Sequence, residues 1–144
     1  MHTTTRMTLV KCALTFCALL FGAVVPYLEI NATHVFNPAW PPHARLHEVW
    51  QLATNSTIAI YCIWMLWFRA NVRLPAWLTI MVTGGFLFAY AIRGAYGGSM
   101  LHTDGTERLL LGMNIGVFGF GVCIFIAVAA LIYEAMTSRH THPN

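Results

Sequence analysis

Three polar side chains stand four residues apart at the start of an otherwise apolar segment. His43, His47 and Gln51 follow one another at steps of four, and Glu48 lies beside His47. Residues four apart share one face of an α-helix, so this spacing predicts a helix with a polar stripe. Lipid cannot satisfy such groups, so the stripe is expected to face protein or trapped water. The sequence therefore predicts a site for chemistry or binding in this region.

Acid–base catalysis is the first chemistry that these residue types support. His47 with Glu48 or Glu107 would supply a base and an acid. Arg93 would stabilise negative charge that develops on a lipophilic substrate. The residues expected to contact that substrate are Gln51, Trp40, Trp50, Tyr90 and Asn114.

Metal binding is the second chemistry that the pattern supports. Two histidines one helical turn apart suit zinc, copper or iron when another histidine and a carboxylate join them. The candidate ligands are His43, His47, His34, His102 and Asp104. A third interpretation makes the polar groups structural, in an accessory subunit or a small transporter.

The composition predicts a membrane protein. Hydrophobic residues make up 58% of the chain and charged residues only 9%, whereas a soluble domain devotes about a quarter to charge. A membrane-spanning helix needs about 20 mostly apolar residues. Four segments qualify, at 9–28, 44–68, 75–96 and 109–133. The predicted fold is all-α, with residues 1–144 forming a single integral membrane domain, a four-helix up-down bundle.

Basic residues before, between and after these segments predict the orientation. Arg6 and Lys11 lie at the start of the first segment, Arg69 and Arg73 separate the second from the third, and Arg139 follows the last. Cytoplasmic loops carry an excess of Lys and Arg, so both the N- and C-termini are expected in the cytoplasm. The polar site then lies near the outer leaflet.

The expected partners are the lipid bilayer and a small lipophilic ligand. The net charge of +3 comes from scattered residues that form no basic patch, which argues against nucleic acid. Glycines at 112, 116 and 119 suit close helix packing. That packing is expected within the chain, with a homo-oligomer or a larger membrane complex as the alternative.

The stretch from Asn37 to Gln51, which reads Asn-Pro-Ala-Trp-Pro-Pro-His-Ala-Arg-Leu-His-Glu-Val-Trp-Gln, resembles the signature of small four-span membrane proteins of bacteria and fungi. Those proteins resemble one another along essentially the whole chain, so the resemblance implies the four-span architecture and no particular activity. A looser likeness to the sterol-isomerase and sigma-receptor superfamily implies a compact bundle for lipophilic or cationic ligands. In this chain, unlike in that superfamily, the carboxylates cluster at the outer rim. The likeness therefore assigns no role to any residue.

Overall fold

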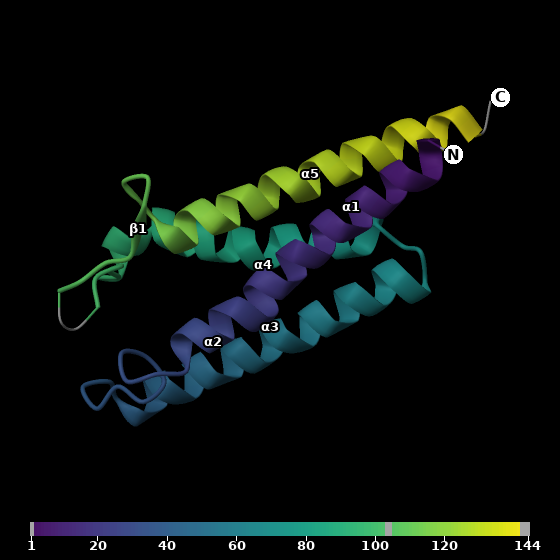
Figure 1. Cartoon of the computed structure of the whole chain (residues 1–144). Coiled ribbons are helices and arrows are strands. Elements are labelled where there is room, and N and C mark those ends of the chain that lie inside the picture. The colour runs from purple at the N-terminus through teal and green to yellow at the C-terminus, as the bar shows by residue number, and fades with distance from the viewer. Residues whose placement is uncertain (1, 103–104, 142–144) are drawn as a thin grey trace.

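The chain is mostly helical (74%) in the computed structural model, which describes residues 2–102 and 105–141. The described part contains four long helical segments that run back and forth along one another (Figure 1). They are α1 (His2–Leu19) continued by α2 (Val25–Glu29), α3 (Pro42–Phe68), α4 (Arg73–Ala91) and α5 (Ile115–Thr141). The all-α prediction is therefore confirmed.

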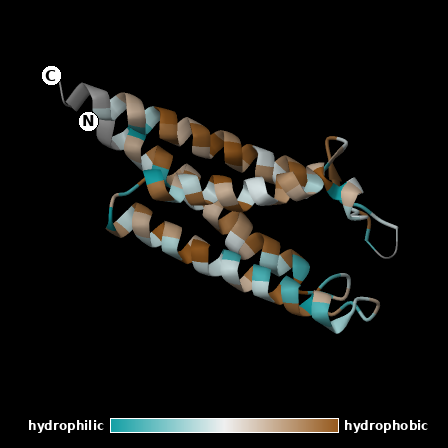
Figure 2. Cartoon of the chain, turned by 180° about the vertical axis from the view of Figure 1, so that it is seen from behind, coloured by the Kyte–Doolittle hydropathy of each residue, from teal (hydrophilic) through white to brown (hydrophobic). Residues whose placement is uncertain are grey.

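Within the described residues, three helical segments are long and apolar enough to cross a membrane. They are Thr5–Glu29, Arg73–Ala91 and Ile115–Ser138. α3 has the same length as α5, but polar residues occupy much of its first half, so its composition does not mark it as a span (Figure 2). The three apolar helices give the chain the character of a membrane protein.

The connections lie at two opposite ends of the helices. The long loops at 30–41 and 92–114 share one end, called here the loop end (Figure 1). The short connection at 69–72 lies at the other end, beside the beginning of α1 and the end of α5. The candidate site lies at the loop end.

A proline interrupts the backbone hydrogen bonding of the first helical segment at the place where that segment contacts α3. Residues Leu20–Val24 form a π-helical turn between α1 and α2. Pro26 has no N–H, so the Gly22 carbonyl lacks the donor that a residue four positions on would normally supply. The Ser56 hydroxyl of α3 donates to this carbonyl at 2.8 Å. This hydrogen bond gives the Gly22 carbonyl a donor and links the first helical segment to α3.

The apolar core consists of two clusters along the bundle. The first lies toward the 69–72 connection and contains Leu14, Leu66, Val72, Ala76, Ala127 and Ala130. The second lies nearer the loop end and contains Ala18, Phe21, Ala59, Cys62 and Phe120. In the second cluster the ring of Phe86 meets that of Phe120 edge-on, with centroids 4.9 Å apart.

The last helix begins later than the sequence predicts. A helix was expected from residue 109, but β1 (Leu109–Leu110) and β2 (Met113–Asn114) form a small antiparallel hairpin there. Its two-residue turn has positive φ angles at Leu111 and Gly112, 53° and 78°, as tight hairpin turns require.

Asn114 then starts α5 instead of lying within a span. Its Oδ1 accepts hydrogen bonds from the backbone N–H of Gly116 at 2.8 Å and of Val117 at 3.3 Å. Asparagine is a preferred residue for capping a helix N-terminus in this way. α4 also ends earlier than predicted, at Ala91, and a 3-10 turn (Arg93–Ala95) follows.

Candidate functional site

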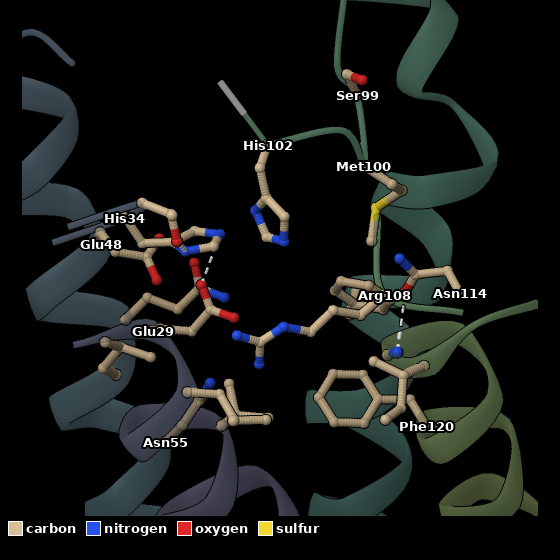
Figure 3. Close-up of a pocket in the computed structure, with 18 of the residues that line it drawn as sticks. Glu29, His34, Glu48, Asn55, Ser99, Met100, His102, Arg108, Asn114 and Phe120 are labelled. Carbon is tan, nitrogen blue, oxygen red and sulfur yellow. Dashed lines mark hydrogen bonds and ion pairs between the residues drawn. The ribbon is translucent and has the colours of Figure 1, made fainter. Parts of the chain in front are cut away.

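A cavity of about 380 Å³ lies at the loop end, among α2, α3, α4, the start of α5 and the two long loops (Figure 3). Its apolar lining comes from the helices and includes Val25, Leu52, Val82, Phe86 and Phe120. Its polar lining includes Glu29, Thr33, His34, Glu48, Gln51, Asn55, Ser99, His102, Arg108 and Asn114. We call these polar residues together the polar wall. Ligand sites in proteins combine such apolar surface with a few placed polar groups.

A second lobe of about 650 Å³ continues this cavity between α3 and α4. The two lobes share Trp40, Glu48, Gln51, Asn55, Val82, Phe86, Ser99 and Met100. Beyond these shared residues, the second lobe follows α4 along Gly85, Ala89, Tyr90 and Arg93. Gly85 leaves open space, because no atom lies within 4 Å of where a Cβ would stand.

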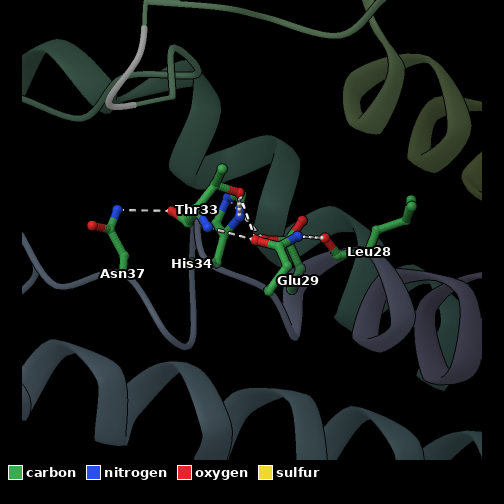
Figure 4. A network of polar contacts seen from close by, with 6 residues as sticks. Leu28, Glu29, Thr33, His34 and Asn37 are labelled. Atoms are coloured by element: carbon green, nitrogen blue, oxygen red, sulfur yellow. Dashed lines mark hydrogen bonds and ion pairs between the residues drawn. The ribbon is translucent and has the colours of Figure 1, made fainter.

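A chain of hydrogen bonds runs along the polar wall (Figure 4). His34 Nε2 lies 2.9 Å from Glu29 Oε2. On the other side of the ring, His34 Nδ1 lies 2.9 Å from the Thr33 hydroxyl, which lies 2.7 Å from Asn31 Oδ1. A neutral imidazole carries one proton, so it donates at one of its contacts and accepts at the other. The His34–Glu29 pair can therefore take up or release a proton beside the cavity.

The loop that carries His34 is held by its asparagines. Asn31 Oδ1 accepts the backbone N–H of Thr33 at 2.7 Å. Asn37 is only 2% exposed; its Nδ2 donates to the Thr33 carbonyl at 2.9 Å, and its Oδ1 accepts from the backbone N–H of Ala39 at 3.0 Å. Such side-chain bonds to nearby backbone fix the turns of an irregular segment. His34 is thus held in place without regular secondary structure.

The second long loop brings His102 and Arg108 to the same wall. The rings of His34 and His102 meet edge-on, with centroids 5.1 Å apart, and the Arg108 side chain extends toward Glu29 (Figure 3). Burial lowers the pKa of His34 below its ordinary value of 6.5, and the positive charges of His102 and Arg108 lower it further. His34 is therefore neutral at pH 7 and available as a base.

The lowered pKa of His34 predicts a pH dependence of stability. The unfolded chain takes up this proton at a higher pH than the folded chain, so the free energy of unfolding falls as the pH drops below 6.5. An NMR titration, with the His34 signal assigned by its loss in a His34→Gln variant, is expected to give a pKa below 6.5. The variant is also expected to lose less thermal stability on acidification than the natural chain. A His34 pKa above 6.5 would contradict this assignment.

The structure brings together part of the predicted site. Six of the predicted residues line the cavity: His34, Trp40, Glu48, Gln51, His102 and Asn114. Tyr90 and Arg93 line the second lobe. Four predicted residues do not line either lobe: His43, His47, Trp50 and Glu107. Asp104 lies outside the described residues.

His43 and His47 lie on a flank of α3 beside the cavity-lining face. Each step of four residues turns about 40° around a helix of 3.6 residues per turn. All three side chains are exposed, but Gln51 lines the cavity and the two histidines line neither lobe. The two histidines share a helix face, as the spacing predicts, but that face lines neither lobe. The histidines contact each other, with their Nε2 atoms 3.0 Å apart, and Trp50 lies beside His47.

Arg93, Glu107 and Asn114 contact other parts of the chain. The Arg93 guanidinium donates to the Tyr90 carbonyl at 2.8 Å and lies 4.0 Å from the centre of the Tyr90 ring. Glu107 accepts a hydrogen bond from the Asn114 amide at 3.1 Å. Among the described residues, no carboxylate forms an ion pair with Arg93. These contacts stabilise the structure at the loop end. Arg93 also lines the second lobe.

Five residues of the polar wall are missing from the sequence-based candidates, and two of them, Glu29 and Arg108, are charged. Glu29 ends the first apolar helix, a position that favours an ordinary interfacial residue. Arg108 precedes the hairpin, where a helix start was expected. A signal for Arg108 exists in the sequence, because it is a cation on the predicted outer side, against the usual bias of basic residues toward the cytoplasm.

In the part of the chain that the structure describes, no group of three or more His, Cys, Asp or Glu residues is arranged to hold a metal ion. His34 and His102 lie in the polar wall, whereas His43 and His47 form a separate exposed pair. Four of the five predicted ligands are thus divided between two places, and Asp104 lies outside the described residues.

Comparisons of the chain with protein-family models, with curated proteins and with solved structures found no match. The function is therefore inferred from the cavity and from the charges and hydrogen-bonding groups around it.

Proposed function

We propose that this chain is a four-helix integral membrane protein whose cavity binds a small lipophilic molecule and offers it acid–base groups. In this proposal α3 crosses the membrane with the three apolar helices, since 27 residues exceed the about 20 that a span needs. Its polar face is turned toward the cavity through Glu48, Gln51 and Asn55. Both termini lie in the cytoplasm and the cavity lies near the outer leaflet.

The observation that carries this proposal is the mixed polar and apolar lining of the cavity. Apolar side chains such as Leu52, Val82 and Phe120 offer surface to a hydrocarbon group. Glu29 and His34 line the same cavity, where they can bind a polar group of the same molecule. A cavity of about 380 Å³ is within the range of about 300–1,000 Å³ that small-molecule sites occupy.

Proton transfer is the chemistry that the polar wall supports best. His34 is neutral at pH 7 because its pKa is lowered by burial and by nearby positive charge. Glu29 lies within hydrogen-bond distance of it. Such a pair can accept a proton from a bound molecule and return it at another atom. Glu48 lines the same cavity as a further acid–base group, and the Arg108 guanidinium can stabilise negative charge on an oxygen.

Binding of radiolabelled dodecanol to the purified protein in lipid nanodiscs tests the proposed function. Saturable binding that excess unlabelled dodecanol displaces is the expected result. Uptake no greater than that of nanodiscs without protein would overturn the proposal. The cavity-closing variant Gly85→Trp serves as the matched background.

One observation favours metal binding as a second candidate function. The Nε2 atoms of His43 and His47 lie 3.0 Å apart on the exposed flank of α3. Two nitrogen ligands at about 2.0–2.1 Å from one zinc ion lie about 3.3 Å apart when the geometry is tetrahedral. A small rotation of the rings would therefore let both histidines bind one ion, with water completing the coordination shell.

Elemental analysis of the purified protein after incubation with zinc, copper or iron tests this second function. One bound ion per chain is expected, and a His43→Ala/His47→Ala double variant is expected to lose it while keeping its helical circular dichroism spectrum. The matched control is His34→Ala/His102→Ala, which leaves the exposed pair intact. A natural chain without metal, or a double variant that keeps its metal, would contradict the assignment.

A further inference from the structure

The second lobe opens sideways between α3 and α4. Gly85 of α4 and Gln51 of α3 both line this lobe, and both are exposed. No atom lies within 4 Å of where a Cβ would stand on Gly85. Val82 and Asn55, which line the same lobe, are only half-buried. The space between the two helices is therefore continuous with the outside of the bundle at Gly85.

This opening lies within the hydrocarbon part of the bilayer in the proposed orientation. At a rise of 1.5 Å per residue, Gly85 stands about 9 Å from the end of α4 at Ala91. Gln51 stands about 14 Å from the start of α3 at Pro42. Both positions are thus inside a hydrocarbon core about 30 Å thick. Phe88, which follows Gly85 on α4, is 65% exposed, as an apolar side chain beside lipid tails is expected to be.

The two long loops cover the cavity on the side that faces water in this orientation (Figure 3). The His34 ring of the first loop meets the His102 ring of the second, with centroids 5.1 Å apart. His34 also packs against Trp40, with ring centroids 5.6 Å apart. Met100 and Leu101 of the second loop line the first lobe as well. A hydrocarbon chain that came from water would therefore have to pass between loops that contact each other.

The opening also offers hydrogen bonds to the polar group of an entering molecule. Gln51 and Asn55 lie one helical turn apart and line both lobes. Their carboxamides donate and accept hydrogen bonds, which lipid tails cannot do. A hydroxyl or carbonyl group that leaves the lipid at this depth therefore meets hydrogen-bonding groups at the opening itself.

We propose that the ligand enters and leaves the cavity sideways, from the hydrocarbon of the bilayer, through the opening between Gln51 and Gly85. This inference rests on the proposed function, because it gives the route by which the lipophilic ligand of that site is exchanged. The bilayer is then the source of the ligand as well as the surroundings of the protein.

The dependence of the exchange rate on chain length tests this route. Dodecanol and hexadecanol, each with a terminal trifluoromethyl group, are dissolved at equal mole fraction in nanodiscs that hold the natural chain. Fluorine exchange NMR then measures how fast bound and lipid-dissolved molecules interchange. For sideways exchange the two rates are expected to agree within about threefold, because the tail never leaves an apolar environment. Exit through water is slowed nearly fourfold by each methylene, or about 200-fold by the four that separate the two alcohols.

The outcomes of this measurement separate the route from the site. A rate that falls about 200-fold from dodecanol to hexadecanol would overturn the inference and leave the proposed function standing. A bound signal from neither alcohol would overturn both. Gly121→Trp, with its new side chain on α5 and away from both lobes, is the control and is expected to keep both rates.

A spin label at Gly85 tests where the opening lies. It is attached to a Gly85→Cys/Cys12→Ser variant, which lacks the exposed native cysteine. Phe125→Cys on α5 gives the reference for lipid, since Phe125 is 75% exposed, and Ala70→Cys in the exposed 69–72 connection gives the reference for water. The label at Gly85 is expected to be relaxed more by oxygen than by a water-soluble nickel chelate, as at Phe125. The opposite order, as at Ala70, would place the opening in water and overturn the inference.

Discussion

Replacing Gly22 by alanine is expected to destabilise the bundle more than any other single-methyl change at its glycines. A Cβ at this position would overlap the Ala59 Cβ and would lie 3.3 Å from the Asn55 carbonyl oxygen of α3. The neighbours include helix backbone, which cannot move aside as a flexible side chain can. Overpacking of this kind costs about 1–3 kcal/mol, which outweighs the gain of about 1 kcal/mol that alanine brings over glycine in a helix.

The effect of Gly22→Ala is measured as the free energy of unfolding in detergent micelles. Gly121→Ala is the matched control, because no atom lies within 4 Å of a Cβ there, and it is expected to be neutral or slightly stabilising. Adding Ala59→Gly to Gly22→Ala removes the overlapping methyl group and is expected to restore most of the loss. If Gly22→Ala is as stable as Gly121→Ala, the close contact between the first helix and α3 is wrong.

Replacing Gly85 by tryptophan is expected to abolish binding of a lipophilic ligand without unfolding the chain. Gly85 lines the second lobe and has open space where a side chain would stand. An indole ring at this position would occupy the gap between α3 and α4 that the tail of the ligand needs. Binding of dodecanol is expected to weaken by at least about tenfold, or about 1.4 kcal/mol.

Gly121→Trp is the control for this change. It introduces the same side chain at another glycine with open space around it, on α5 and away from both lobes. It is expected to bind dodecanol as the natural chain does, and both variants are expected to keep the natural helical content. Undiminished binding by Gly85→Trp would mean that the ligand does not use the second lobe.

The helices could be predicted from the sequence because local rules dominate there. Apolar runs and the prolines at Pro41 and Pro42 predict α3 to within a few residues of its observed start. The start of α5 could not be predicted, since Leu111 adopts a positive φ that leucine rarely takes. Apolar residues at 109–113 therefore look like the beginning of a span although they form a hairpin.

The candidate site was harder to predict, because most of its polar wall comes from loops. Glu48 and Gln51, which the sequence singles out on this helix, line the cavity, but helical spacing does not show that His43 and His47 lie outside it. His34 reaches Glu29 only through turns that Asn31 and Asn37 hold. Such contacts depend on the folded loop and have no periodic signal. The resemblance to small four-span membrane proteins stays a prediction.

Photolabelling with a diazirine-bearing long-chain alcohol, followed by peptide mapping, tests the central claim most directly. The predicted result is labelling within residues 48–55 of α3 and 82–89 of α4, which excess dodecanol suppresses and Gly85→Trp prevents. Labelling confined to outward-facing positions such as Phe125, which is 75% exposed, and unchanged by excess dodecanol would contradict it. The alcohol would then be dissolved in the surrounding lipid, and the cavity would not be its binding site.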